Sequence, residues 1–162
     1  VLNAQEGDFD FNNREQAYES GIVMAASLLR QLYSLRQEVG FICNARLDDK
    51  DRFLYENVKK GENHFTTILT HLAKMTPAKK LSLEEILDPA KLSLGWGVSI
   101  YVLTPRLSDG AMNRLIHYRQ AGHAVAVINT SQVIKNDMSL WNIGFQTFFP
   151  ENQEGVISLL RV

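Results

Sequence analysis

Short apolar runs that alternate with helix-like segments are the feature that most constrains this fold. The clearest runs are Val39–Cys43, Val98–Leu103 and Ala124–Ile128. Apolar runs of this length are typical of strands that are buried on both faces. The segments between them carry apolar residues at helical spacing. Strands that alternate with helices over short connections predict a mostly parallel sheet with helices on both of its faces.

Capping signals predict where two of the helices begin. Asn13 with Gln16 three residues later indicates the start of a long helix that runs to about Leu35. Ser82 with Glu85 indicates the start of a short one. In both pairs, the first side chain can accept a hydrogen bond from the backbone of the first turn, and the second can accept one in return.

The other expected elements follow from turn residues and from apolar spacing. They are an antiparallel edge strand Phe53–Val58, a helix from about Asn63 that ends at Thr76–Pro77, a helix that Ser108 caps and Gly122 ends, a short helix Met138–Trp141 and a last strand Phe145–Phe149. Val156–Leu160 fits either a helix or a strand. The turn Gly95–Gly97 is expected to pack Trp96 into the core or against an edge.

Bulk composition limits the classes of function. The 162 residues fit one domain with a proper core, and the formal net charge of -1 argues against a nucleic-acid surface. Cys43 is the only cysteine, so no internal disulfide forms, and its apolar surroundings predict a small buried side chain. No apolar stretch approaches the length that crosses a bilayer. Because Val1 lies inside the end of a strand pattern, we expect the chain to be a fragment of a longer protein.

The loop after the first strand carries alternating acidic residues. Glu6, Asp8 and Asp10 could hold a cation, but Phe9 and Phe11 interrupt them, and no second ligand segment is identifiable. A solvated acidic loop is therefore the preferred interpretation. The two phenylalanines would either pack down as anchors or, if exposed, suit a protein-binding surface.

Other residues with chemical potential have structural explanations. His64 and His71 lie seven positions apart, whereas zinc-binding helices prefer four, so they are expected to be helix-surface histidines. The acidic group Asp48–Asp51 lacks the spacing of a calcium loop. No phosphate-binding glycine loop follows a strand, and no nucleophile elbow is present.

Three segments together resemble the bacterial family named domain of unknown function 58, a von Willebrand factor A-like group. The segments are Ala25–Leu29 with Val39–Phe41, Gly61–His64 with Ile68–Met75, and Val102–Leu107 with Ala121–Val125. They span most of the chain. Each is a structural pattern rather than a catalytic signature.

The resemblance implies a site at the first strand-to-loop turn, where such domains usually carry Asp-x-Ser-x-Ser and hold a divalent cation. The matching positions here are Asn3, Gln5 and Gly7. Such domains also usually carry an Asp just after the strand that corresponds to Val98–Leu103. That Asp is missing here, because the strand leads into Arg106. Hard cations prefer anionic oxygen, so the metal site is expected to be degenerate. We assign no metal ligand, no cofactor and no catalytic residue.

We therefore expect one von Willebrand factor A-like domain over residues 1–162. It would be an α/β fold, a three-layer α/β/α sandwich, with a mostly parallel sheet and one antiparallel edge strand. The expected function is non-catalytic protein–protein interaction through the loops at the carboxyl edge of the sheet. The candidate contact residues are Asp8, Phe9, Asp10 and Arg106, and Arg106 is hypothesised to pair with the acidic loop around Asp8.

The resemblance also implies membrane segments ahead of the domain and a MoxR-type AAA ATPase as partner. The chain would then be a cytoplasmic domain of a membrane-anchored protein that touches the membrane only through segments outside this chain. Two alternatives stay open. One is a metal-dependent, adhesion-type domain that uses Asp8 and Asp10, and the other is an enzyme on a flavodoxin-like or hydrolase scaffold.

Overall fold

The computed structural model describes residues 1–48, 50–88, 92, 94–131 and 146–148. The strands are β1 (Leu2–Asn3), β2 (Val39–Leu47), β3 (Lys50–Lys59), β4 (Thr76–Pro77), β5 (Ser99–Thr104), β6 (Ala124–Asn129) and β7 (Gln146–Phe148). The α-helices are α1 (Arg14–Ser34), α2 (Glu62–Lys74), α3 (Leu83–Ile86) and α4 (Asp109–Gln120).

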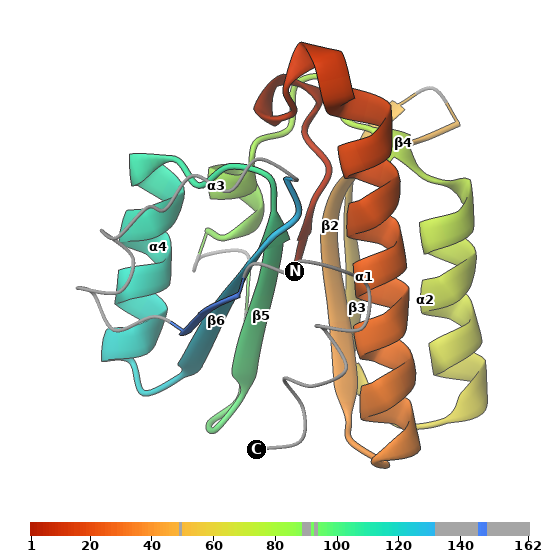
Figure 1. Ribbon diagram of the computed structural model, residues 1–162. Coiled ribbons are helices and arrows are strands. Elements are labelled where there is room, and N and C mark those ends of the chain that lie inside the picture. Colours follow the sequence, from red (N-terminus) through yellow and green to blue (C-terminus); the bar gives the residue numbers. More distant parts are fainter. Residues whose placement is uncertain (49, 89–91, 93, 132–145, 149–162) are drawn as a thin grey trace.

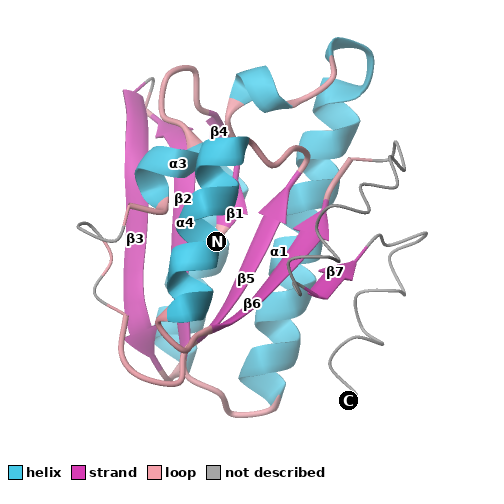
Figure 2. Ribbon diagram, turned by 90° about the vertical axis from the view of Figure 1, so that its left-hand side faces the viewer, coloured by secondary structure: helices cyan, strands magenta, loops and turns pink. Residues whose placement is uncertain are grey.

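The strands form one sheet in the order β3-β2-β1-β5-β6-β7, and β4 pairs with β2 from outside this path. β1, β2, β5, β6 and β7 run parallel, whereas β3 and β4 run antiparallel to β2. This confirms the expected α/β fold with a mostly parallel sheet and an antiparallel edge strand. Figure 2 shows β3 at that edge, with β5 and β6 beyond the short β1.

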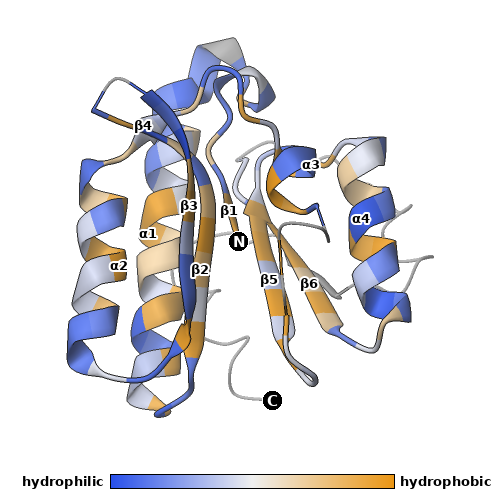
Figure 3. Cartoon of the chain, turned by 180° about the vertical axis from the view of Figure 1, so that it is seen from behind, coloured by the Kyte–Doolittle hydropathy of each residue, from blue (hydrophilic) through white to orange (hydrophobic). Residues whose placement is uncertain are grey.

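Helices lie on both sides of the sheet. α1 and α2 lie on one side, and α3 and α4 lie on the other (Figure 1). The buried apolar residues accordingly form two clusters, one under α1 and α2 and the other under α3 and α4. Figure 3 shows that β2, β5 and β6 are mostly hydrophobic, as expected for strands covered on both faces.

α1 approaches the sheet closely because its inner face carries small residues. Gly21 is buried, and a Cβ atom there would lie 3.6 Å from side-chain atoms of both Leu2 and Thr130. The expected capping box at Asn13 is wrong, because its side chain makes no cap hydrogen bond. A 3-10 turn (Phe11–Asn13) leads directly into α1, so Asn13 lacks the extended backbone of a capping residue.

Two other caps are confirmed. Ser82 and Glu85 form the expected capping box at the start of α3. The Ser108 hydroxyl accepts a hydrogen bond from the backbone N–H of Ala111 at the start of α4. Trp96 contradicts the sequence-based expectation, because its side chain is 97% exposed in the turn before β5.

Residues Thr76–Pro77 follow α2, as expected, but they also form a strand. Their register pairs Pro77 with Ala45 and Thr76 with Arg46. Proline has no backbone N–H to donate, and it is tolerated at the edge of a sheet because no further strand requires that hydrogen bond. This pairing was missed because a two-residue strand has no periodicity of its own.

The last expected elements are only partly visible. The strand expected at Phe145–Phe149 is found as β7 over Gln146–Phe148. The helix expected at Met138–Trp141 and the ambiguous segment Val156–Leu160 lie outside the described residues. Among the described residues, no helix combines the length and the apolar character that crossing a membrane requires.

We expect Leu115→Ala in α4 to lower the free energy of unfolding by about 3 kcal/mol. Leu115 is fully buried, so its truncation removes apolar contact and leaves a cavity. Denaturant titration with Asn113→Ala as control measures this, because Asn113 is exposed on the same helix. A Leu115→Ala protein no less stable than the control would contradict the described packing of α4.

Candidate functional site

The site expected from sequence lies at the edge of the sheet where β1, β5 and β6 end. Parallel strands gather the loops that follow them at such an edge. The loop after β1 crosses this edge through two short 3-10 helices, η1 (Glu6–Asp8) and η2 (Phe11–Asn13), before it enters α1 (Figure 1).

A row of four polar residues crosses the sheet at this level. Asn3 of β1 pairs with Asn44 of β2, and Thr104 of β5 pairs with Asn129 of β6. A hydrogen bond from Asn3 to Thr104 joins the two halves of the row. Asn3, Asn44 and Thr104 are at most 2% exposed. Polar groups buried this deeply need hydrogen-bond partners inside the protein.

Asn3 uses its whole hydrogen-bonding capacity. Its Nδ2 donates to Asp8 Oδ2 at 2.7 Å and to Thr104 Oγ1 at 2.9 Å. Its Oδ1 accepts from the backbone N–H of Gln5 at 3.1 Å and from Asn44 Nδ2 at 2.8 Å. Because a carboxylate accepts and a backbone N–H donates, these partners fix which end of the Asn3 amide is nitrogen.

Asn44 extends the network to the other side of β1. Its Oδ1 accepts from the backbone N–H of Ala4 at 2.6 Å, and its Nδ2 also donates to the carbonyl of Leu81 at 2.9 Å. Thr104 in turn donates its hydroxyl proton to the carbonyl of Arg106. The network thus ties three adjacent strands to the loops that follow β1 and β5 and to the loop that precedes α3.

The acidic loop is anchored from two directions. Asp8 is half-buried and accepts the hydrogen bond from Asn3. Glu6 forms an ion pair with Arg14 in the first turn of α1. Asp10 stays exposed. Of the three candidate acids, only Asp10 therefore points freely to solvent.

The hypothesis that Arg106 supplies a cation to this loop is wrong. Arg106 is exposed, and within the described part of the chain it makes no ion pair with Asp8 or Asp10. Asp8 instead faces inward, where the Asn3 amide already satisfies it. The role of Arg106 in protein binding stays a prediction.

Phe9 is a packing anchor. It is 6% exposed, and its ring lies edge-on to that of Tyr18, with centroids 6.0 Å apart. The Tyr18 hydroxyl donates to the carbonyl of Met75 at 2.8 Å, and burial raises the pKa of Tyr18. Phe9 therefore supports the loop from below and is not available at the surface. The side chain of Phe11 lies outside the described residues.

The carboxyl edge of the sheet, together with the loops that follow its strands, is called the rim below. The described residues of this rim do not fit a divalent cation. Among the described residues, no group of three or more His, Cys, Asp or Glu side chains could hold a metal ion. At the centre of the polar row, the N–H groups of Asn3 point at the carboxylate of Asp8 and at the hydroxyl of Thr104. A hard cation needs oxygen lone pairs at that point, and the amide nitrogen has none to offer.

Cys43 behaves as expected. It is fully buried, and its Sγ lies 3.7 Å from the Sδ of Met75. Burial raises the pKa of its thiol, so the nucleophilic thiolate is strongly disfavoured.

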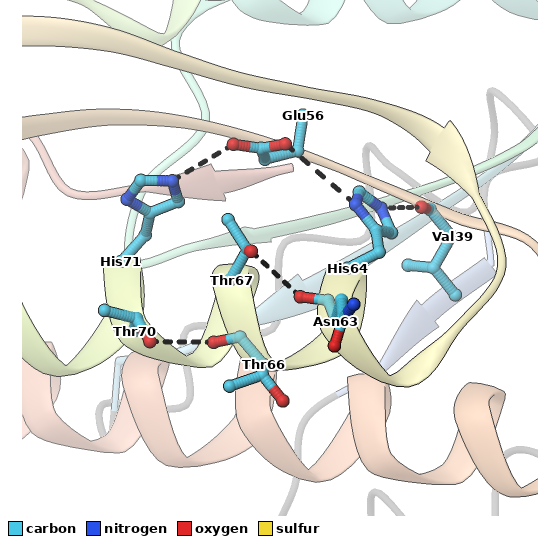
Figure 4. Close-up of polar contacts among 8 residues, drawn as sticks. All are labelled: Val39, Glu56, Asn63, His64, Thr66, Thr67, Thr70 and His71. Carbon is cyan, nitrogen blue, oxygen red and sulfur yellow. Dashed lines mark hydrogen bonds and ion pairs between the residues drawn. The ribbon is translucent and has the colours of Figure 1, made fainter.

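His64 and His71 are more than helix-surface residues, because both face Glu56 of β3 from α2 (Figure 4). His71 Nε2 lies 3.1 Å from one carboxylate oxygen, and His64 Nδ1 lies 4.0 Å from the other. His64 Nε2 also lies 2.8 Å from the carbonyl of Val39, to which it donates. The rings approach the carboxylate from opposite sides, so the three groups do not converge on one point. This cluster holds α2 against β2 and β3.

Sequence reasoning found Asn3 but missed its two main partners, Asn44 and Thr104. In the sequence, each directly follows an apolar run that predicts a strand. The available signal was that a polar residue follows the buried run in three strands, at Asn3, Asn44 and Thr104. Only the strand register shows that these three positions are neighbours.

Comparison with known proteins adds evidence about the fold alone. No family model and no curated protein matches this chain. A solved structure that resembles it is proximal thread matrix protein 1 from the mussel byssus, in its crystal form 2, with a TM-score of 0.54 and 13% sequence identity. The match covers 99% of this chain and 42% of that protein. The chain thus spans less than half the length of that protein.

We expect Asn44→Ala to lower the free energy of unfolding by about 3 kcal/mol. The change leaves the Ala4 N–H and the Leu81 carbonyl without the partners described above, and unpaired buried groups are costly. Asn57→Ala is the matched control, because Asn57 lies exposed on β3. Denaturant titration of the two variants would contradict the network if their effects were equal.

Proposed function

We propose that this chain is a von Willebrand factor A-like domain that binds a protein partner, without catalysis, at a degenerate metal site. The proposed architecture is the three-layer α/β/α sandwich. Its support is the strand order, with an antiparallel edge strand next to parallel strands and helices on both sides. In that architecture the carboxyl edge of the sheet is the ligand-binding edge, which here carries the polar row.

The observation that carries the proposal is the saturated amide of Asn3. A cation at this edge would be expected to bridge a carboxylate and a hydroxyl, and Asp8 and Thr104 are groups of those two kinds. They are bridged by the Nδ2 group of Asn3 instead. The amide supplies hydrogen-bond donors where a metal would supply positive charge, so the loop after β1 is held in place by the protein itself.

The rim around this network offers charges of both signs. Asp10 and Arg106 are exposed and lie on loops that follow neighbouring strands, β1 and β5. An interface with mixed charge favours specificity and fast association rather than high affinity. This suits a regulated contact with another protein, and a MoxR-type AAA ATPase is the partner class that the family resemblance suggests. The domain would then face the cytoplasm as part of a membrane-anchored protein.

The degenerate-site proposal predicts that divalent cations do not stabilise the protein. Thermal unfolding in EDTA and in millimolar magnesium, manganese or calcium should give the same midpoint. Occupancy of a site at 100 times its dissociation constant would add about 2.7 kcal/mol, a shift of roughly 5–10 °C for a chain of this size. A shift that Asp8→Ala and Asp10→Ala abolish would instead establish metal-dependent binding through these two residues.

Asn3→Asp is the positive control for that experiment. It places a second carboxylate beside Asp8, at a position where the present separation is 2.7 Å. Repulsion between the carboxylates should lower the unfolding midpoint in EDTA, and a divalent cation should partly restore it. If the variant responds and the wild-type protein does not, the Asn3 amide is the reason that the site rejects metal.

Partner binding is tested by charge reversal at the rim. Asp10→Lys with Arg106→Glu should weaken binding to a MoxR-type ATPase by 10-fold or more, measured by interferometry with purified proteins. Lys59→Glu with Glu62→Lys is the matched control, because both residues are exposed at the opposite end of the sheet. Equal affinities for both double variants would exclude the rim as the contact surface.

A further inference from the structure

Two segments of opposite charge lie side by side at the rim. One is the acidic loop after β1, and the other is the segment after β4, which carries Lys79 and Lys80. Backbone hydrogen bonds join them directly. The N–H of Ala78 donates to the carbonyl of Ala4, and the N–H of Glu6 donates to the carbonyl of Ala78, both at 2.8 Å. The two lysines are therefore neighbours of the site described above.

The backbone around these lysines is fixed on two sides. Asp51 Oδ2 accepts a hydrogen bond from the backbone N–H of Lys79 at 3.0 Å and another from that of Lys80 at 2.6 Å. The carbonyl of the next residue, Leu81, accepts the hydrogen bond from Asn44. A segment that is already ordered loses little conformational entropy when a ligand binds to it. The loop after β4 therefore holds the two lysines in a preformed arrangement.

The side chains of Lys79 and Lys80 have no counter-ion within the described part of the chain. Both residues are exposed, and neither forms an ion pair there. Asp51 directs one carboxylate oxygen at their backbone N–H groups. The two ammonium groups are consequently available to an anion from outside the chain.

Basic side chains continue around the turn between β2 and β3. Lys50 and Arg52 flank Asp51 in β3, and because side chains alternate along a strand they lie on the opposite face from it. That face is the one covered by α1 and α2, since Leu54 belongs to the buried cluster under these helices. Lys74 is exposed at the end of α2. The term basic patch is used for the exposed residues Lys50, Arg52, Lys74, Lys79 and Lys80.

The position of the basic patch limits the kind of anion that fits. Figure 1 shows β4 and the turn between β2 and β3 at the same end of the molecule as the loop after β1. Asp48 is exposed in that turn, and Asp10 is exposed in the acidic loop. A long phosphate backbone would run into these like charges. A short acidic peptide segment places its charges on the lysines and can meet the acids with other residues.

We propose that the basic patch binds an acidic segment of a protein partner, whose Asp or Glu carboxylates contact Lys79 and Lys80. This inference rests on the proposed function, because it specifies the chemistry of the segment that the rim holds. Charges of both signs in fixed neighbouring places also select the direction in which such a segment lies. Its acidic part lies on the lysines, and a basic residue beside that part faces Asp10.

Binding of a labelled hexaglutamate peptide to the purified protein tests the chemistry of the patch. Fluorescence anisotropy at low ionic strength should detect binding, and a labelled hexaglutamine peptide should bind at least 10-fold more weakly. Raising the salt concentration from about 10 mM to about 150 mM should weaken the binding of hexaglutamate, because salt screens exposed charges. Equal binding of the two peptides would contradict recognition by charge.

Charge reversal shows whether the patch itself is the binding surface. Lys79→Glu with Lys80→Glu should weaken hexaglutamate binding by 10-fold or more. Lys59→Glu with Lys60→Glu is the matched control, because it changes the net charge equally at two exposed lysines at the opposite end of β3. Its effect should stay within about 3-fold, because charges far from the peptide are screened. The unfolding midpoints of both double variants check that they fold.

Three outcomes would overturn the inference. Equal losses in the two double variants would show that the peptide follows net charge and not the patch. A single-stranded oligonucleotide that binds more tightly than hexaglutamate, and that is lost in the Lys79 and Lys80 variant, would assign the patch to nucleic acid. No binding of hexaglutamate, together with binding of a MoxR-type ATPase that depends on Asp10 and Arg106, would remove this inference and leave the proposed function in place.

The reverse result is equally distinct. Hexaglutamate binding that depends on Lys79 and Lys80 would support the acidic-segment chemistry. If Asp10→Lys with Arg106→Glu then left the binding of the ATPase unchanged, the contact surface proposed above would fail while the basic patch kept its assigned ligand.

Discussion

The carboxyl edge of the sheet depends on one buried carboxamide, that of Asn3, whose hydrogen-bonding groups are all paired. Asn3 sits at the end of the central strand and contacts β2, β5 and the loop after β1 at once. Each of its four hydrogen bonds has a defined donor and acceptor. A network that is fully satisfied rigidifies its surroundings, whereas one missing partner would make the same burial costly. The edge is therefore ordered by neutral amides, supported below by Phe9 and secured beside it by the ion pair of Glu6 with Arg14.

The two ends of β1 present opposite situations. At its carboxyl end, the buried side chains of Asn3, Asn44 and Thr104 are hydrogen-bonded to one another and to nearby loops. At its amino end, the first residues of β2 and β5 face a cavity, and apolar side chains such as Trp96 and Leu35 stand exposed around it. The carboxyl edge is thus suited to present a preformed polar surface.

Much of the architecture was predictable because burial leaves a periodic mark on the sequence. The apolar runs predicted β2, β5 and β6, and the serine caps predicted the starts of α3 and α4. The predictions that failed rested on local sequence signals that the surrounding structure overrides. Asn13 does not cap α1 because a 3-10 turn precedes it, and Trp96 is exposed although its size favours burial. His64 and His71 were assigned to the helix surface, because Glu56, their shared partner, lies on a different element.

The sequence by itself determined the class of fold, the antiparallel edge strand and the polar composition of the first loop, which carries the amides of Asn3 and Gln5. Those properties depend on residues that are close together in the chain. Only the tertiary structure decided which groups meet. It joined Asn3 to Asn44 and Thr104, and it paired Asp8 with the Asn3 amide. Strand register sets these contacts, and register depends on how distant segments pack, which no local pattern encodes.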